Sequence, residues 1–300
     1  MKKRFTLAET ASLVAALAAF ILLLIKTGGT IATESVGLFA SLVDSSLDLI
    51  ASFITYLGIS LANKPADPSH RYGHGKAEAV SSFAQAGFMA ASALFLVIEA
   101  ISRFIHPRAI EQENIGIALM IFSCLVTLGV VIFQRYAAQK TGSMALLADS
   151  KHYVADFMMA IAVIIGLLAH KLFDINALDT GLSVIVGIYL AFHAVDTGKN
   201  AVDMLMDREL PDHIREEIIA TILAHPQAKG LHDLRSRKSG KGIFAEFHLE
   251  LDGKLSLDES HQITDEIEQQ LMEKFPYSEF SLHQEPFDID DDRLDHRIKL

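Results

Sequence analysis

Long apolar segments recur along the first two thirds of this chain, and they constrain its fold more than any other feature. Six of them fall near residues 7–27, 36–62, 77–105, 115–138, 144–170 and 178–200. A helix needs about 20 residues to cross a hydrocarbon core of about 30 Å, and each segment is long enough. A soluble domain would not need such segments. The sequence therefore predicts an α-helical membrane protein with six transmembrane helices.

Basic residues gather at one set of segment ends, which predicts the orientation of the helices. These ends carry Lys2, Lys3, Arg4, Lys64, Arg71, Lys76, Arg135, Lys140 and Lys199. The opposite loops hold only Arg108 and Lys171, with Arg103 near the end of its segment. Because cytoplasmic loops carry the excess of basic residues, we expect both termini in the cytoplasm. The first apolar run lacks a small-residue cleavage site, which favours a membrane helix over a signal peptide.

A soluble domain is predicted from about residue 208, where the long apolar runs stop. The segment DHIREEIIATILA places Ile214, Ile218 and Ile222 on one face of an amphipathic helix. The segments LHDLRSRK and GIFAEFHLEL flank SGKG, a pattern typical of a β-hairpin. The first half of this domain is therefore expected to run helix, strand, strand.

The second half of the soluble domain adds a helix and a strand. SLDESHQITDEIEQQLMEKF predicts the helix, with Ser256 as its N-cap and Glu259 completing a capping box. EFSLHQEP predicts a last strand that Pro286 stops. The order predicts an α+β domain, with both helices on one face of a three-stranded sheet. We expect a transmembrane domain at 1–207, a cytoplasmic domain at 208–287 and a disordered acidic tail at 288–300.

Charged side chains interrupt two of the apolar segments. Asp44 and Asp48 lie four residues apart in the second segment, and His152 and Asp156 lie four apart in the fifth. A carboxylate at the centre of a membrane helix costs about 2.5–3.5 kcal/mol on insertion scales. Residues four apart share one helix face, so each helix offers two side chains in one direction. This spacing indicates a functional site.

The two pairs also match in depth. At 1.5 Å per residue, Asp44 lies roughly 12 Å and Asp48 roughly 18 Å below the outer edge. The fifth segment runs the other way, so Asp156 falls near the level of Asp44 and His152 near that of Asp48. All four are close to the middle of the core. Three carboxylates and one imidazole suit a tetrahedral ion such as zinc, and a divalent ion neutralises most of their charge.

Alternatives remain for these acids. A buried carboxylate can instead brace helices through hydrogen bonds, but the matched depths of three acids and a histidine favour a metal site. Asp149 competes as a ligand, because it shares a helix face with His152 and Asp156. It lies nearer the cytoplasmic edge, where either a structural role or a role in ion access stays open.

Further histidines form two more candidate clusters. The loop NKPADPSHRYGHGKAE holds Asp67, His70 and His74, which indicates either a metal cluster or simply a flexible loop. In the soluble domain, His283 and Glu285 lie two apart on a strand and hence on one face. They can converge with His232, His248 and His261. The alternative there is a set of exposed surface histidines.

The motifs of this chain together resemble one family. D-x-x-x-D, H-x-x-x-D, RYGHGKAE, LHDLRSR, FHLELDG and HQEP are similar to those of the cation diffusion facilitators, over nearly the whole chain. The resemblance implies a homodimeric divalent-metal/proton antiporter of the bacterial inner membrane, whose soluble domain has a metallochaperone-like (ferredoxin-like) fold. It implies a transport site of Asp44, Asp48, His152 and Asp156, a loop site of Asp67, His70 and His74, a binuclear site of His232, His248, His261, His283 and Glu285, and a charge interlock of Lys76 and Asp207 at the dimer interface.

Two positions depart from the family pattern. Glu285 stands where relatives have Asp, which makes a bridging geometry less secure by one methylene. Lys151 stands beside His152, where relatives carry an apolar residue thought to gate access. Its charge either repels incoming metal or pairs with Asp149 and faces a wet cavity.

The sequence favours a transporter that exports a divalent cation in exchange for protons. Carboxylates and an imidazole bind either protons or metal, so the two compete. We expect no cofactor; the bound species are divalent ions, zinc foremost, with cadmium, cobalt and iron(II) also suited. A membrane-anchored metal sensor is the alternative, although an anchor needs no charge at the membrane centre. No H-E-x-x-H, G-x-S-x-G or P-loop pattern indicates an enzyme, and nothing indicates a nucleic-acid partner.

Overall fold

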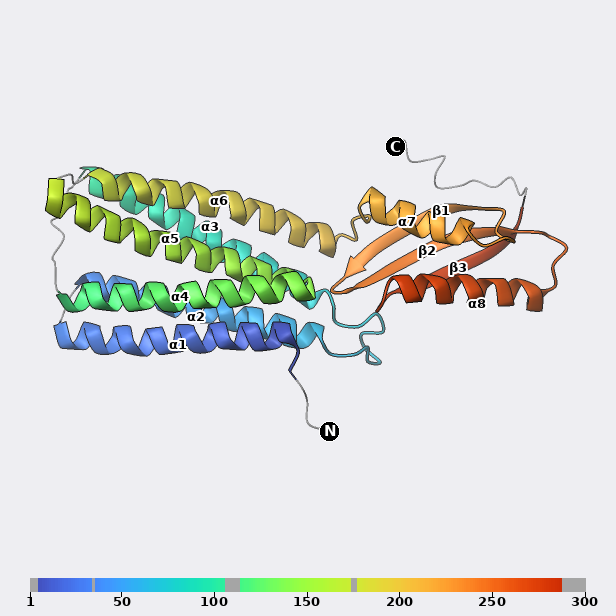
Figure 1. Cartoon of the computed structure of the whole chain (residues 1–300), viewed down its shortest axis with the longest axis horizontal. Coiled ribbons are helices and arrows are strands. Elements are labelled where there is room, and N and C mark those ends of the chain that lie inside the picture. Colours follow the sequence, from blue (N-terminus) through green and yellow to red (C-terminus); the bar gives the residue numbers. More distant parts are fainter. Residues whose placement is uncertain (1–4, 34–35, 106–113, 174–176, 288–300) are drawn as a thin grey trace. The chain divides into compact units, whose positions relative to one another are not determined.

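A computed structural model describes residues 5–33, 36–105, 114–173 and 177–287 of the chain (Figure 1). The chain divides into two compact units, Met1–Val202 and Asp203–Leu300, and each is described by itself. The acidic tail expected at 288–300 lies outside the described residues.

The first unit is a bundle of long helices, which confirms the predicted helical membrane region. The helices are α1 (Leu7–Thr33), α2 (Val36–Ala62), α3 (Ala77–Ile105), α4 (Asn114–Thr141), α5 (Met144–Phe173) and α6 (Ala177–Leu205). Within the described residues, all but α5 contain a span long and apolar enough to cross a membrane. The described part of α5 carries three charged residues within eight positions, Asp149, Lys151 and Asp156.

Small residues line the interior of this bundle. On α1, Ala8, Ala11 and Ala15 are almost fully buried, whereas Leu17 and Leu24 are about half exposed. A helix in lipid gains little by hiding large apolar side chains, so small residues that let backbones approach closely form the contacts. The exposed leucines fit a face toward lipid chains.

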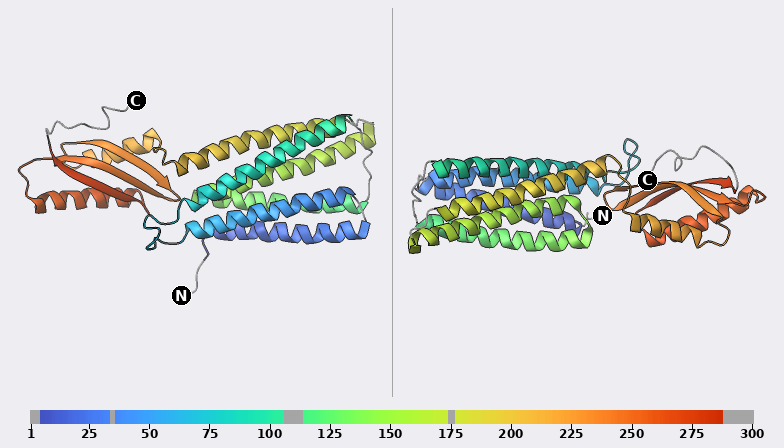
Figure 2. Two further views of the ribbon diagram at one scale, coloured as in Figure 1. Left: turned by 180° about the vertical axis from the view of Figure 1, so that it is seen from behind. Right: turned by 90° about the horizontal axis from the view of Figure 1, so that it is seen from above.

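Helices α2 and α5 are brought together inside the bundle. Helix α1 packs against α2 and α4, α4 packs against α5, and α2 in turn contacts both α3 and α5. Figures 1 and 2 show these helices running side by side along the bundle. The two helices that carry the intramembrane charges are therefore neighbours.

Up to residue 287, the second unit is a three-stranded sheet with two helices. Its elements are α7 (Asp212–Leu223), β1 (Gly230–Ser239), β2 (Gly242–Leu251), α8 (Leu257–Lys274) and β3 (Glu279–Pro286). Strand β2 lies in the middle, antiparallel to β1 and parallel to β3. Figure 2 shows α7 and α8 on the same face of the sheet. The predicted order and layering are confirmed.

Local sequence signals account for these elements. Ile218 and Ile222 of α7 are fully buried in the core, with Ile214 packed against it. Ser256 and Glu259 form the expected capping box at the start of α8. The hairpin turns at Gly240, whose φ of 59° lies in the left-handed region that glycine adopts at little cost.

The alternation along β2 sorts its residues between two faces. Ala245, Phe247 and Leu249 are buried in the core beside α7 and α8. Because successive side chains point to opposite faces, His248 and Glu250 lie on the face away from the helices. His248 pairs in register with His232 of β1 and His283 of β3. Three histidines thus lie in a row across the sheet.

Candidate metal-binding sites

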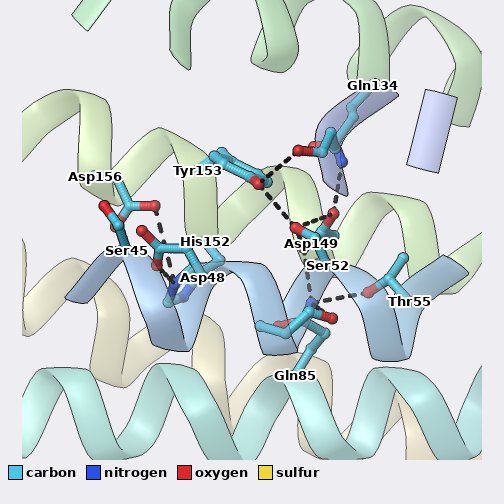
Figure 3. A network of polar contacts seen from close by, with 12 residues as sticks. Ser45, Asp48, Ser52, Thr55, Gln85, Gln134, Asp149, His152, Tyr153 and Asp156 are labelled. Atoms are coloured by element: carbon cyan, nitrogen blue, oxygen red, sulfur yellow. Dashed lines mark hydrogen bonds and ion pairs between the residues drawn. The ribbon is translucent and has the colours of Figure 1, made fainter. Parts of the chain in front are cut away.

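Three predicted ligands meet between α2 and α5. Nε2 of His152 lies 3.1 Å from Oδ1 of Asp48 and 3.9 Å from Oδ2 of Asp156. One ligand atom from each residue lies within 4.8 Å of the other two. Figure 3 shows them as one cluster of α2 and α5 side chains. The set offers two oxygens and one nitrogen to a single point.

Burial makes this cluster chemically demanding. The side chain of His152 is 5% exposed, and those of Asp48 and Asp156 are 22% and 33% exposed. Carboxylates held together in a low-dielectric setting repel one another unless a cation or protons compensate. Asp44 lies one turn before Asp48 on α2, but its side chain falls outside the described residues. Next to it, Ser45 accepts a 2.7 Å hydrogen bond from Lys26 of α1, a cation that the sequence reasoning did not include.

Asp149 belongs to a different group of side chains. Its carboxylate accepts hydrogen bonds from Nε2 of Gln85 at 2.7 Å and from Nε2 of Gln134 at 2.6 Å. It is fully buried and is not part of the group with Asp48, His152 and Asp156. The geometry therefore favours the structural role that had been left open for it.

Lys151 pairs with Asp196 rather than with Asp149, which argues against one of the two alternatives left open for it. Its Nζ lies 2.7 Å from Oδ2 of Asp196 on α6 and 3.5 Å from Oγ1 of Thr197. Lys151 and His152 are consecutive on α5 and so point in different directions, by about 100° around the helix. The amine is directed to α6, while Asp149 meets the amides of α3 and α4.

The loop between α2 and α3 brings together Asp67, His70 and His74. Oδ1 of Asp67 lies 3.3 Å from Nδ1 of His70, and Oδ2 lies 3.3 Å from Nε2 of His74. The backbone N–H groups of His70 and Ser69 also donate to Asp67, each at 2.8 Å. These hydrogen bonds, led by that of His70, lower the pKa of Asp67 and favour the ionised form that a metal needs.

A third cluster lies on the helix-free face of the soluble domain's sheet. Glu285 places Oε1 2.6 Å from Nε2 of His232 and Oε2 3.3 Å from Nδ1 of His248. The ring of His283 lies 4.8 Å from that of His248. The glutamate thus reaches two imidazoles at once, and its role in bridging two metal ions stays a prediction.

Close contacts that lack hydrogen-bond geometry indicate that this cluster fits a metal. Nε2 of His232, Nδ1 of His248 and Oε1 of Glu285 are buried, and the described residues give them no hydrogen-bond partner of acceptable geometry. Buried polar atoms of this kind are rare because each costs free energy. Nitrogen and oxygen donors directed at one point are what zinc-like ions bind.

His261 is not brought into this cluster. Its Nε2 lies 3.6 Å from Oδ2 of Asp265, one turn along α8, and its side chain is 71% exposed. The predicted five-residue site is therefore only partly assembled in the single chain. The sequence reasoning missed Glu250, whose Oε1 lies 2.9 Å from Nδ1 of His232. Its position two residues after His248 on β2 was the available signal, because such residues share a face.

The expected interlock residues lie in separate units. Lys76 immediately precedes α3, and Asp207 follows α6 with a left-handed φ of 56°. Oδ2 of Asp207 lies 3.3 Å from Nη1 of Arg237 on β1. A contact between Lys76 and Asp207 across a dimer stays a prediction.

Comparison with known proteins places the chain in a family. Residues 12–206 match the cation efflux transmembrane domain, and residues 210–287 match the cytoplasmic domain of cation efflux proteins. The chain belongs to the cation efflux family. These are the cation diffusion facilitators that its motifs resemble, and the matching transmembrane domain is described as one for cation efflux. Membership and the apolar helices make the chain an integral membrane protein.

Curated members of the cation efflux family are similar along most of their length. The cation-efflux pump FieF of Serratia proteamaculans is 38% identical over 283 residues, which cover 94% of each chain. The FieF pump of Klebsiella pneumoniae is 38% identical over 285 residues, again 94% of each chain. Among solved structures, the metal-bound C-terminal domain of the CzcD transporter from Thermotoga maritima is 26% identical. It covers 26% of this chain and 93% of its own, with a TM-score of 0.26.

Proposed function

We propose that the protein exports divalent metal cations of the zinc class from the cytoplasm, in exchange for protons. The observation that carries this proposal is the convergence of Asp48, His152 and Asp156 within 4.8 Å inside the membrane bundle. Asp44, one turn away on α2, completes a four-ligand site in the proposal. The FieF relatives, which are named cation-efflux pumps, support the direction of transport.

Charge explains why a metal is the cargo. Three carboxylates and a neutral imidazole carry a formal charge of −3, which a divalent ion reduces to −1. Nitrogen and carboxylate ligands at about 2.0–2.2 Å suit zinc, and cadmium, cobalt(II) and iron(II) accept the same donors. The cluster therefore stabilises a dehydrated divalent ion where an unpaired charge would be expensive.

Competition for the same atoms explains the coupling to protons. Nε2 of His152 faces two carboxylates, so in the metal-free site a proton can lie between them. A metal must displace protons from its ligands in order to bind. If the site opens alternately to the two sides of the membrane, metal leaves as protons arrive.

The rest of the chain takes supporting roles in this proposal. Residues 1–207 form the transport domain in the bacterial inner membrane, with both termini cytoplasmic. Residues 208–287 form a regulatory domain that binds metal through His232, His248, His283 and Glu285 and takes part in a homodimer. His261 lies on α8. It joins that site only if α8 moves toward it or if a second copy of the chain supplies its own His261. The loop of Asp67, His70 and His74 is a further, more exposed metal site.

A membrane-anchored metal sensor is the second candidate, favoured by the buried His232–Glu285 cluster alone. The sensor candidate assigns no role to the intramembrane cluster of Asp48, His152 and Asp156. The two candidates differ in metal flux. A transporter carries flux and loses it when His152 is removed, whereas a sensor binds metal through its soluble domain and carries no flux.

Uptake of metal into vesicles tests the proposal. Purified protein in liposomes should accumulate zinc, and Asp48→Ala or His152→Ala should abolish the flux while the protein still inserts. Ser46→Ala is a matched control on α2, because its hydroxyl donates to the backbone carbonyl oxygen of Leu42 on its own helix. Near-normal zinc flux in His152→Ala, or no flux in the unaltered protein, would overturn the proposal.

A further inference from the structure

A second polar layer lies one turn from the metal cluster. Figure 3 shows it on the right, around Asp149, separate from Asp48, His152 and Asp156. On α5, Asp149 precedes His152 by three residues, about 4.5 Å of rise, and on α2 Ser52 follows Asp48 by four, about 6 Å. The two layers therefore share the same pair of helices.

The layer joins five helices through hydrogen bonds. Asp149 of α5 accepts from Gln85 of α3 and Gln134 of α4, at 2.7 and 2.6 Å. Ser52 of α2 lies 3.3 Å from Asp149 and 2.8 Å from the hydroxyl of Tyr153. The Tyr153 hydroxyl also lies 3.3 Å from the backbone carbonyl oxygen of Ala15 on α1.

The donors in this layer are arranged around a negative charge. Gln85 and Gln134 both turn their NH₂ groups to Asp149, although their own carbonyl oxygens then have no partner among the described residues. The hydroxyls of Ser52 and Tyr153 have one hydrogen each, but they make three contacts: Ser52 with Asp149, Ser52 with Tyr153, and Tyr153 with the carbonyl oxygen of Ala15. Charge-assisted hydrogen bonds are the stronger ones, so Ser52 donates to Asp149, and the single hydrogen of the Tyr153 hydroxyl is shared between Ser52 and the carbonyl oxygen of Ala15. The carboxylate thus receives three donors and lies outside the group of side chains that could hold a metal ion.

We propose that Asp149 is a positioning residue, which fixes the rotation and register of α5 against α2 and so sets the distances among the metal ligands. This inference rests on the proposed function, because it concerns the same site. Asp149 does not touch the ion. It acts through His152 and Asp156, which can meet Asp48 only at one rotation of α5. Removing residues that hold metal ligands in place typically weakens metal binding about 10- to 100-fold, and Asp149 holds them through the backbone of α5 rather than by direct contact.

The visible spectrum of bound cobalt(II) reports the geometry of its ligands. Loss of a residue with a purely structural role would leave that spectrum unchanged. The full chain in detergent is titrated with cobalt(II), and the absorption lost in His152→Ala isolates the intramembrane site. In Asp149→Asn we expect cobalt affinity at this site to fall about 10- to 100-fold and its visible spectrum to shift. The half-saturating zinc concentration for flux should rise in parallel.

A donor–acceptor exchange serves as the rescue. In the double variant Asp149→Asn with Gln134→Glu, the amide and the carboxylate trade places across the same contact, so cobalt affinity and spectrum should return toward those of the unaltered protein. Glu78→Gln is the matched control. Glu78 is also buried and holds the start of α5 through the Ser143 hydroxyl at 2.8 Å, but it lies outside the layer. We expect it to lower thermal stability and leave the cobalt spectrum unchanged.

The outcomes separate this inference from the proposed function. If His152→Ala removes no cobalt absorption from the unaltered protein, the intramembrane site does not bind metal and both proposals fall. If the site binds cobalt but Asp149→Asn leaves its affinity and spectrum unchanged, only the positioning role is overturned. Should Asp149→Asn fail to insert, Ser52→Ala removes a single donor and must weaken cobalt binding in the same direction; an unchanged affinity there also overturns it.

Discussion

A single imidazole nitrogen faces two carboxylates in the membrane site, and this limits which ions can bind. Nε2 of His152 is the nitrogen donor beside the oxygens of Asp48 and Asp156. Borderline ions such as zinc accept nitrogen readily, whereas manganese(II) and magnesium prefer oxygen alone. The histidine is therefore the residue expected to set metal preference.

Exchange of this nitrogen for oxygen should change the preference. His152→Asp is expected to lower zinc transport and raise transport of manganese(II) relative to it, because the site becomes all oxygen. Competition between the two ions for flux in vesicles measures this ratio. A ratio equal to that of the unaltered protein would mean that His152 does not select the ion.

At the residue scale, the sequence predicted that Asp48, His152 and Asp156 meet, but not which side chains lie next to them. Spacing along one helix is visible in sequence, so the proximity of His152 and Asp156 could be worked out beforehand. The partners of Asp149 and Lys151 depend on how helices rotate against one another. Gln85 and Gln134 come from other helices, and Lys151 meets Asp196 on α6. No periodicity in a single sequence carries that information.

At the scale of elements, close packing against α3 fixes the position of α2, the helix that carries Asp48. A Cβ added at Gly58 would lie 2.4 Å from Cβ of Ser81 and 3.2 Å from the carbonyl oxygen of Ala77. Neither atom is the end of a flexible chain, so the helices would have to separate. Helix lengths were predictable from apolar runs, whereas this contact was not, because it depends on which faces meet.

Gly58→Ala should therefore destabilise the bundle. Overpacking of this kind typically costs about 1–3 kcal/mol, and the shift of α2 should also reduce zinc flux. The midpoint of thermal unfolding in detergent measures the effect. Gly87→Ala on α3 is the control, since a Cβ there meets nothing within 4 Å. Equal midpoints for the two variants would contradict the packing account.

At the scale of the whole molecule, the chain divides its metal ligands between two units. The soluble cluster belongs to a separate unit from the membrane site, so it can influence transport only through a change of conformation or assembly. A ligand shifts such an equilibrium by no more than its difference in affinity for the two states. Coupling of about 5–150-fold is usual for linked sites.

His232→Ala should therefore keep part of the transport but raise the zinc concentration needed for activity and weaken dimerisation. Zinc titrations of flux and of dimer fraction measure both quantities. His225→Ala is the matched control, because His225 is also buried in this domain but pairs with Glu266 rather than with the cluster. Unaltered curves for His232→Ala would make the cluster irrelevant to regulation.

The central claim is that metal and protons compete for the cluster of Asp48, His152 and Asp156. Simultaneous recording of zinc flux and internal pH in vesicles tests it most directly. The account predicts that zinc movement drives protons the opposite way, that an opposing pH gradient accelerates it, and that both signals vanish together in His152→Ala. Zinc accumulation that continues with the pH gradient collapsed, or without any proton movement, would contradict the account.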